Sequence, residues 1–439
     1  MARWYFRIVP DGPAFDVIRS GRDPERRDPG RGRLLAGVAV AILIAGGIAV
    51  HLVLGVSSRP SHHAARSFRS SVALAAPPIF HGTPLRPGIA HPALLFLGGG
   101  GLRLLDAGGR APASLTDLWS GAVPGRDPLG PGAAVQQVAS VSGGVVALIS
   151  GHGAAGLPDT GDVLFIPVGA AGAGVPRVIA RANYMAVAPD QRRIWVEQAG
   201  PPWGNGPAGS PAWLIDEAGH RVSGPLDLGE RVLAAATVRG LLAQGPAGVL
   251  TMIDPADGSA QPAGIPQNAI IAGADAYQVA WQAASCPGRC PLHVTDLRGG
   301  RGIEISLPPH TAINPDDTPD FDPSGQRLAL PLDTIDHQGL ATGTYVYVAD
   351  ISARTLIRVP GGPIPVSALP PVLGAFPAGA SDVVSARWAA NDSGLWIVAT
   401  DGLFFQAAYW TGTGPLHVLQ PQAGLAYKFG IPRGDTPSR

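Results

Sequence analysis

A short unit of sequence that recurs along residues 91–420 constrains the fold more than any other feature. The unit is an apolar run of strand-forming residues that ends in Asp and passes into a turn with Gly or another small residue. It occurs as LRLLDAGG (102–109), WLIDEAGH (213–220), LTMIDPADG (250–258), LHVTDLRGG (292–300) and VYVADISAR (346–354). The Asp residues of the last four copies are 38, 42 and 54 residues apart, which indicates a degenerate structural repeat.

A second unit, a polar turn that leads into a strand, precedes some of these copies. It occurs as VAPDQRRIWV (187–196), FDPSGQRLAL (321–330) and AANDSGLWIV (389–398). The Asp or Asn side chain can bond to the backbone of its own turn, and a Gly, where present, can adopt positive φ. Turn, strand, connection, strand and turn together predict a four-stranded antiparallel blade, and repeats of this length predict a β-propeller.

The composition agrees with an all-β fold. Gly (60) and Pro (45) together supply 105 of the 439 residues, while hydrophobic residues make 46% and charged residues 15%. Helical bundles do not tolerate Gly and Pro at this density, and disordered chains have fewer apolar residues and more net charge.

FDPSGQRLAL and the following YVYVADISARTLIRVP resemble the WD40-like repeat of TolB-type β-propellers. No copy combines the Gly-His and Trp-Asp pairs of true WD40 repeats, so their hydrogen-bond network is not implied. We predict seven blades, with six or eight as alternatives, and a closing strand from LAYKFGIP (425–432). The predicted blades span residues 91–118, 135–181, 184–226, 231–263, 268–308, 319–361 and 382–420, within a propeller at 91–432.

The N-terminal part predicts a membrane anchor. Residues Leu34 to Val56 form a 23-residue apolar run that is long enough to cross a bilayer as a helix. Six Arg lie within twenty residues before the run and three within twenty residues after it, which favours a cytoplasmic N-terminus and an extracytoplasmic body. The alternative is a cleaved signal peptide, whose apolar core would be shorter. The expected flanks are an Arg-rich cytoplasmic tail (1–33), a Pro-rich stalk (57–90) and a disordered C-terminus (433–439).

The distribution of charge argues against nucleic acid as a partner. The first 33 residues carry eight Arg and five acidic residues, so the remaining 24 basic and 27 acidic residues give residues 34–439 a net charge of −3. A faintly acidic body lacks the clustered Lys and Arg that bind phosphate backbones. The expected partners are therefore the lipid bilayer and an extracytoplasmic protein or small ligand.

The two cysteines, Cys286 and Cys290, lie in SCPGRCP between two predicted strands. An exported domain permits a disulfide, and the central Pro-Gly supplies a tight turn, so we predict a structural disulfide. A redox pair would favour Cys-x-x-Cys at a helix start, and a zinc site would need two further ligands. We predict no cofactor and no metal.

No motif predicts catalysis. The sequence lacks a phosphate-binding loop, a Gly-x-Ser-x-Gly elbow and His-Glu-x-x-His. Four acidic residues cluster in NPDDTPDFDPSG (Asp316, Asp317, Asp320 and Asp322). Carboxylates at this spacing could hold Ca²⁺, but their order is not that of an EF-hand, and a turn into a blade uses the same residues. No catalytic residue is predicted.

Two insertions predict a binding surface. Trp203 and Asn205 lie in AGPPWGNGPAGSPA (199–212), and His337 lies in TIDHQGLATG (334–343). Equivalent blades would place both insertions on one face, where a Trp is a favoured contact residue. We predict a non-catalytic binding module. The alternatives are a hydrolase or lyase with its site in the propeller channel, and a sensor that signals through the cytoplasmic tail.

Overall fold

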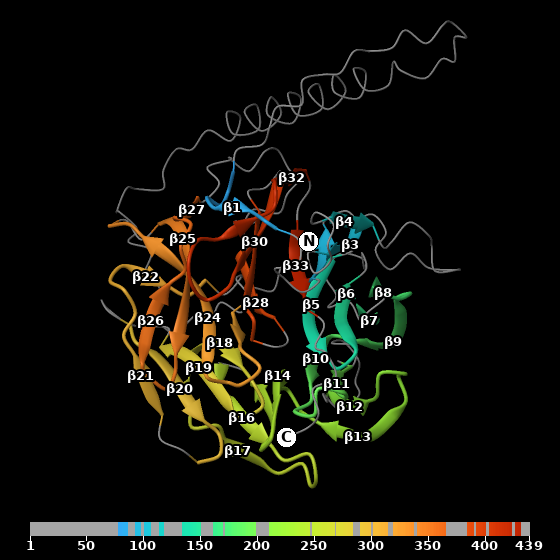
Figure 1. The fold of residues 1–439 in the computed structure, drawn as a ribbon. Helices are drawn as coiled ribbons and strands as arrows, with labels where there is room; N and C mark the ends of the chain where they lie inside the picture. Colours follow the sequence, from blue (N-terminus) through green and yellow to red (C-terminus); the bar gives the residue numbers. More distant parts are fainter. Residues whose placement is uncertain are drawn as a thin grey trace, which may run out of the picture. The chain divides into compact units, whose positions relative to one another are not determined.

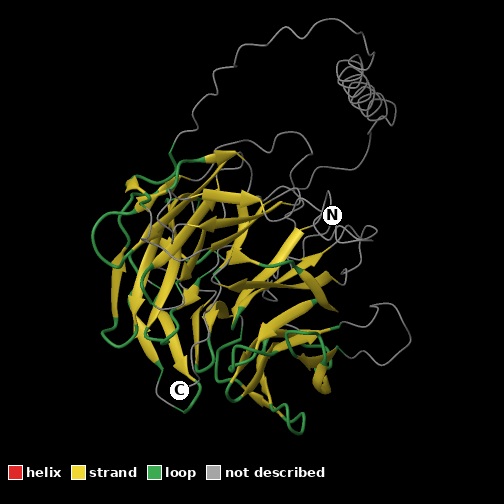
Figure 2. Cartoon of the chain, turned by 45° about the vertical axis from the view of Figure 1, so that its right-hand side comes forward, coloured by secondary structure: helices red, strands yellow, loops and turns green. Residues whose placement is uncertain are grey.

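The computed structural model describes residues 78–86, 93–97, 101–106, 114–117, 134–150, 161–169, 172–198, 210–245, 248–267, 269–283, 290–299, 302–314, 319–337, 340–365, 384–389, 392–400, 404–423 and 426–431. These residues form strands, turns and loops, and they contain no α-helix (Figure 2). The prediction of an all-β fold is confirmed for this part of the chain.

The described strands form seven sheets, and six of these consist of strands that follow one another along the chain. In the first three, the second and third strands lie at the centre (Figure 1). One contains β5 (Ala134–Val141), β6 (Gly144–Ser150), β7 (Gly161–Gly169), β8 (Gly172–Ala173) and β9 (Arg177–Ala182). The next contains β10 (Tyr184–Val187), β11 (Ile194–Glu197), β12 (Pro211–Ile215) and β13 (Arg221–Asp227). A third contains β14 (Val232–Thr237), β15 (Gly240–Gln244), β16 (Leu250–Ile253) and β17 (Ala260–Pro262).

The other three sheets of consecutive strands follow the same plan, and two of them have additional short strands. One contains β18 (Ala269–Ala274), β19 (Gln278–Ala283), β20 (Leu292–Asp296) and β21 (Ile303–Ile305). The next contains β22 (Thr311–Ala312), β23 (Asp320–Phe321), β24 (Arg327–Ile335), β25 (Ala341–Asp350), β26 (Thr355–Arg358) and β27 (Ile364–Pro365). The last contains β28 (Val384–Trp388), β29 (Leu395–Thr400), β30 (Phe404–Trp410), β31 (His417–Val418) and β32 (Gln422–Ala423), with β1 (Thr83–Pro84) parallel to β31 at its edge.

The seventh sheet joins the two ends of the propeller. It contains β2 (Ala93–Leu97), β3 (Gly101–Asp106) and β4 (Ser114–Asp117), and β33 (Ala426–Gly430) pairs antiparallel with β2. The predicted closing strand is therefore confirmed. The prediction of seven blades is corrected to six, which was one of the stated alternatives. The described strands form six blades whose strands follow one another along the chain, and the remaining small sheet is assembled from both ends of the propeller. Strand β33 contacts both β5 and β28, so the composite sheet lies between the first and last continuous sheets.

The recurring Asp residues occupy one kind of position, the hairpin between the third and fourth strands of a sheet. The carboxylate of Asp216 accepts the backbone N–H groups of Ala218 and His220 at 2.9 and 2.8 Å. Asp254, Asp296 and Asp350 accept a backbone N–H two or three residues ahead, each at 2.8 Å. An Asp at this position caps its own turn, which explains why the repeat is visible in the sequence.

The second repeated unit forms the turn between the first and second strands. Asp190 accepts the N–H groups of Arg192 and Arg193, both at 3.0 Å. Asp322 accepts those of Gln326 and Arg327 at 2.8 and 3.1 Å. Both repeated units therefore act as side-chain-capped turns.

Strand alternation assigns the connections to two opposite faces of the ring. Because the first to fourth strands of each blade pair antiparallel, the first-to-second and third-to-fourth turns share one face, called here the Asp-turn face. The second-to-third connections lie at the opposite face, called here the connection face. Segment 198–210 connects β11 to β12, and segment 336–340 connects β24 to β25, so both predicted insertions belong to the connection face.

The hydrophobic core is divided among the seams between neighbouring sheets. The β5–β9 sheet has an apolar cluster on each face: Leu164 belongs to one cluster and Val163 to the other. The second cluster fills the seam with the next sheet, where it includes Ile194. The seam between the β28–β32 sheet and the composite sheet contains Trp396 and Tyr409, which are fully buried. The β5–β9 sheet thus buries both faces, which is consistent with the nearly continuous apolar strands of its sequence.

Residues 78–86, which fall within the predicted stalk, pack on the propeller. Ile79 and Phe80 are buried, and the side-chain oxygen of Gln406 accepts their N–H groups at 2.8 and 2.7 Å. The tail, the apolar run 34–56, the rest of the stalk and residues 433–439 lie outside the described residues. Within the described part of the chain, no helix has the length and apolar character to span a membrane.

Candidate functional site

One acidic and one basic side chain meet where the first strands of three sheets approach one another. Arg387 on β28 donates from Nη1 to Oδ1 of Asp320 on β23 at 3.1 Å, and from Nη2 to the carbonyl oxygen of Val138 on β5 at 3.0 Å. Oδ2 of Asp320 accepts the N–H of Trp388 at 3.0 Å. Only 15% of the Arg387 side chain and 18% of the Asp320 side chain are exposed. This pair links three sheets of the ring.

A second arginine lies on the other side of the β23–β24 turn. Nε of Arg327 donates to Oδ2 of Asp322 at 2.8 Å, and the Asp322 side chain is fully buried. The guanidinium also stacks over the ring of Trp388, with Cζ 4.2 Å from the ring centroid. The interaction fixes the turn that the sequence repeat marks.

These contacts bear on the acidic cluster considered as a calcium site. Asp320 and Asp322 are each hydrogen-bonded to an arginine, and Asp316 and Asp317 lie outside the described residues. No group of three His, Cys, Asp or Glu side chains suited to a metal ion occurs among the residues that the structure describes. The two described carboxylates therefore have structural partners within the protein.

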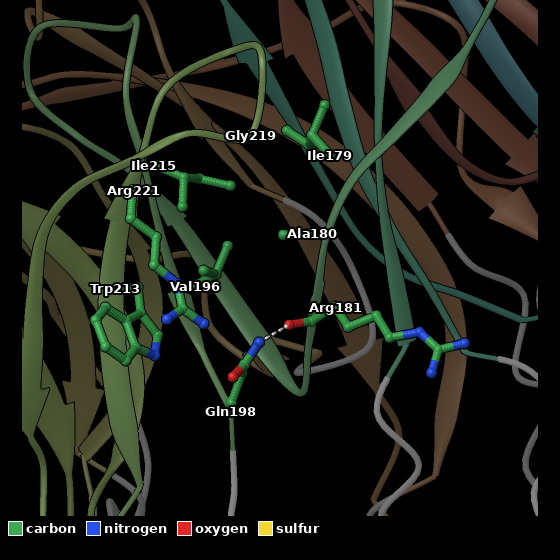
Figure 3. Close-up of a pocket in the computed structure, with 9 residues that line it drawn as sticks. All are labelled: Ile179, Ala180, Arg181, Val196, Gln198, Trp213, Ile215, Gly219 and Arg221. Atoms are coloured by element: carbon green, nitrogen blue, oxygen red, sulfur yellow. Dashed lines mark hydrogen bonds between the residues drawn. The ribbon is translucent and has the colours of Figure 1, made fainter.

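A cleft of about 170 Å³ opens between the β5–β9 and β10–β13 sheets (Figure 3). Its apolar surface comes from both sheets, and its polar groups are two arginines and one glutamine. Arg221 on β13 stacks over Trp213 on β12, with Cζ 3.8 Å from the ring centroid. The lining residues are Ile179, Ala180, Arg181, Val196, Gln198, Trp213, Ile215, Gly219 and Arg221.

Both ends of this cleft are tied across the seam. At the connection face, Nε2 of Gln198 donates to the carbonyl oxygen of Arg181 at 2.9 Å, which Figure 3 shows as a dashed line. At the Asp-turn face, Gly219 lies so close to the Ile179 carbonyl that an added Cβ would overlap it. The width of the cleft is thereby set by contacts between the two sheets.

A buried carboxylate lies in the next seam, between the β10–β13 and β14–β17 sheets. The Glu197 side chain at the end of β11 is 1% exposed, and its Oε2 accepts the N–H of Leu233 at 2.6 Å. Burial raises the pKa of this carboxyl from 4.5 to about 7, although the hydrogen bonds from Leu233 and the Ser210 side chain oppose the shift. Burial and the nearby Glu197 charge also raise the pKa of Tyr184. The seam therefore contains a group that titrates near neutral pH.

The structure places only part of the predicted site. His337 is exposed after the end of β24, on the connection face, while Trp203 and Asn205 lie outside the described residues. Cys286 also lies outside them, so its pairing with Cys290 stays a prediction. The carbonyl oxygen of Cys290 accepts a hydrogen bond from Nε2 of Gln282 at 3.4 Å.

The cleft was not predicted from the sequence. Trp213 and Arg221 flank the Asp216 hairpin in WLIDEAGHR, and a hairpin brings residues on either side of its turn together. That local pairing was detectable. The contribution of Ile179 and Arg181 was not, because it depends on how two neighbouring sheets pack.

The topology defines the protein as a β-propeller. No protein-family model matches the sequence, and no characterised protein matches it. Solved structures match in fold, and TolB is among the propellers that the chain resembles.

TolB from Acinetobacter baumannii matches with a TM-score of 0.38 and 12% identity, over 62% of this chain and 64% of the TolB chain, which is just under two thirds of its length. AztD from Citrobacter koseri matches with a TM-score of 0.39 and 11% identity, over 80% and 88% of the two chains. The β-propeller domain of the Trilobed protease from Pyrococcus furiosus matches with a TM-score of 0.38 and 11% identity, over 64% and 84%.

Proposed function

We propose that the protein is a single-pass membrane protein whose extracytoplasmic propeller binds a partner through its connection face. The observation that carries this proposal is that segments 198–210 and 336–340 occupy the same type of connection. Rigid rings that present several loops on one face are suited to binding, because function concentrates on loops held by a scaffold. Trp203, Asn205 and His337 are the proposed contact residues.

The proposed location rests on the sequence before the propeller. The apolar run at 34–56, with more Arg before it than after it, favours a cytoplasmic N-terminus and export of the propeller. Residues 78–86 pack on the propeller, so residues 57–77 would connect the apolar run, which ends at Val56, to the ring. The predicted Cys286–Cys290 disulfide agrees with an oxidising compartment.

A binding role is favoured over catalysis by the contacts of the polar groups between the first strands. Asp320 and Arg387 bind each other, the N–H of Trp388 and the carbonyl oxygen of Val138. These bonds hold three sheets in place. A carboxylate and a guanidinium used in this way have a structural role that accounts for their position.

The test of the binding face is site-specific photo-cross-linking in intact cells. A photoreactive residue replaces Trp203, Asn205 or His337 in three variants, and Asp257 or Arg298, exposed on the Asp-turn face, in two controls. The proposal predicts the same cross-linked product from the first three positions and none from the controls. Products that are equally abundant from both faces, or found only from the controls, would contradict it.

The location is tested separately by labelling the same cells with a membrane-impermeant amine reagent. Lys428 is the single lysine of the chain, and the N-terminal amine is the other site. The labelled variant carries Arg298→Lys, which adds an amine on an exposed hairpin of the propeller, and its labelling is compared with that of the unmodified chain. Labelling of R298K in intact cells supports export of the propeller, whereas labelling only after lysis contradicts it.

A further inference from the structure

We propose that the cleft between β9 and the β12–β13 hairpin binds the carboxylate of a small molecule or peptide terminus with an apolar side group. This site goes beyond the partner-binding face, because it lies between two sheets and uses other residues. Its defining groups are Arg221, Trp213 and Gln198, with an apolar floor from both sheets.

The charge of the cleft favours an anion. Two arginines line it, and no Asp or Glu does. The guanidinium of Arg181 is bonded to Asp162 at 3.2 Å, and its side chain points away from Arg221 (Figure 3). The Arg221 side chain stacks on Trp213 and has no hydrogen bond or ion pair to any residue that the structure describes. The cleft therefore contains one positive charge that no carboxylate of the described chain neutralises.

The stack on Trp213 orients this charge. The face of the Arg221 guanidinium lies over the indole ring at 3.8 Å, which leaves the N–H groups at its edge for other partners. A planar fork of N–H donors matches the two oxygens of a carboxylate. Because the ring limits the positions that the guanidinium can adopt, less conformational freedom is lost when an anion binds.

The rest of the cleft suits a short apolar group. Ala180 on β9 and the Trp213 ring on β12 are half-buried and supply apolar surface beside the charged end, above the buried side chains of Val196 and Ile215. A volume of about 170 Å³ is comparable to that of a cavity of roughly 150 Å³ that accepts benzene. The ligand class that fits both ends is an acid with a branched or cyclic side group of a few carbon atoms.

The binding experiment titrates the full chain in detergent with N-acetyl-leucine and measures the heat of binding by isothermal titration calorimetry. N-acetyl-leucine amide has the same apolar group without the carboxylate. We expect saturable binding of the acid, and binding of the amide weakened by about tenfold or more, because the charge-assisted hydrogen bonds are lost. Equal binding of the two compounds, or no saturable binding of the acid, would overturn the proposal.

Two variants show whether the binding is at this cleft. Arg221→Gln should weaken binding of N-acetyl-leucine by about tenfold, since it removes the charge. Arg358→Gln is the matched control, because Arg358 stacks over Tyr345 on the neighbouring strand in another sheet, with Cζ 5.1 Å from the ring centroid. R358Q should bind as the unmodified chain does. Loss of affinity in both variants, or in neither, would place the ligand elsewhere.

The source of the carboxylate is distinguished by two further ligands. Isovalerate represents a free small acid, and a tetrapeptide that ends in Leu represents a peptide C-terminus. Tighter binding of the tetrapeptide assigns the site to peptide termini, and equal or tighter binding of isovalerate assigns it to free acids. The cross-links from the connection face should be unchanged in R221Q, so failure of one proposal does not imply failure of the other.

Discussion

Arg387 reaches from β28 to Val138 on β5, where its Nη2 donates to the backbone carbonyl oxygen at 3.0 Å. The composite sheet of β33 and β2–β4 lies between these two strands, because β33 contacts both of them. The same guanidinium binds Asp320 on the other side of β28. One side chain thus supports the closure of the ring in addition to the pairing of β33 with β2.

Replacement of Arg387 by Ala should therefore destabilise the propeller. The change leaves Asp320 with the Trp388 N–H and without a cationic partner, and removes the donor to Val138. Because both side chains are mostly shielded, we expect a loss of about 1–3 kcal/mol in the free energy of unfolding. Denaturant unfolding measures it. The control is Arg298→Ala, whose ion pair with Asp296 is exposed to solvent and should contribute little to stability. Equal losses would contradict a special role for Arg387.

Gly219 is expected to be the most sensitive hairpin glycine of the inter-sheet cleft. It has φ of 87°, and a Cβ would overlap the carbonyl oxygen of Ile179 on the neighbouring sheet. Gly299 occupies the equivalent kind of hairpin with φ of 95°, but no atom lies within 4 Å of its Cβ position. Gly299→Ala should cost about 1 kcal/mol from backbone strain alone. Gly219→Ala should cost about 2–4 kcal/mol, because the two sheets must also move apart. Thermal unfolding of both variants compares them, and a similar loss in each would contradict the close packing.

The Glu197 carboxyl should make stability depend on pH. Its pKa is about 7 in the folded chain, above the ordinary value of 4.5, so the folded chain holds a proton that the unfolded chain releases. Stability must then fall as pH rises from about 4.5 to about 7, by at most about 3 kcal/mol. Glu197→Gln keeps an oxygen for the Leu233 N–H and does not titrate.

We therefore expect the E197Q variant to match the unmodified chain near pH 5 and to be more stable near pH 8. Melting temperatures recorded across this range provide the comparison. Glu304→Gln is the control, since Glu304 is 69% exposed, and it should leave the pH profile unchanged. An E197Q profile parallel to that of the unmodified chain would show that another group causes the dependence.

The fold was largely predictable because its turns carry their own signal. Asp190, Asp216, Asp254, Asp296 and Asp350 each accept backbone N–H groups of the turn in which they lie, so the residue type and the turn are locally linked. The closing strand was predictable from its apolar pattern at 425–432. The number of blades was not predicted correctly, since the sheet formed by the two ends of the propeller leaves no local spacing that distinguishes it from a blade of consecutive strands.

Of the candidate functional residues, only those in the long connections between strands could be predicted from the sequence. The sequence identified the insertions at 199–212 and 334–343, and antiparallel topology places both on one face. By contrast, the cleft depends on the approach of β9 to the β12–β13 hairpin, and the Arg387 contacts join residues 249 positions apart. Such side-chain pairs are fixed by sheet packing, which a single sequence does not encode at any regular interval.

Gln406 should control how firmly the segment before the propeller is attached. Its Oε1 accepts the N–H groups of Ile79 and Phe80, and its Nε2 donates to the carbonyl oxygen of Leu419 at 2.8 Å. Gln406→Leu removes all three bonds at a buried position, so the amides of residues 78–86 should exchange with solvent faster. Hydrogen exchange followed by mass spectrometry measures this segment in the full chain. Gln422→Leu is the control, because the Gln422 side chain bonds only within its own loop. Faster exchange in Q406L alone would establish Gln406 as the attachment point, and unchanged exchange would mean that apolar packing of Ile79 and Phe80 suffices.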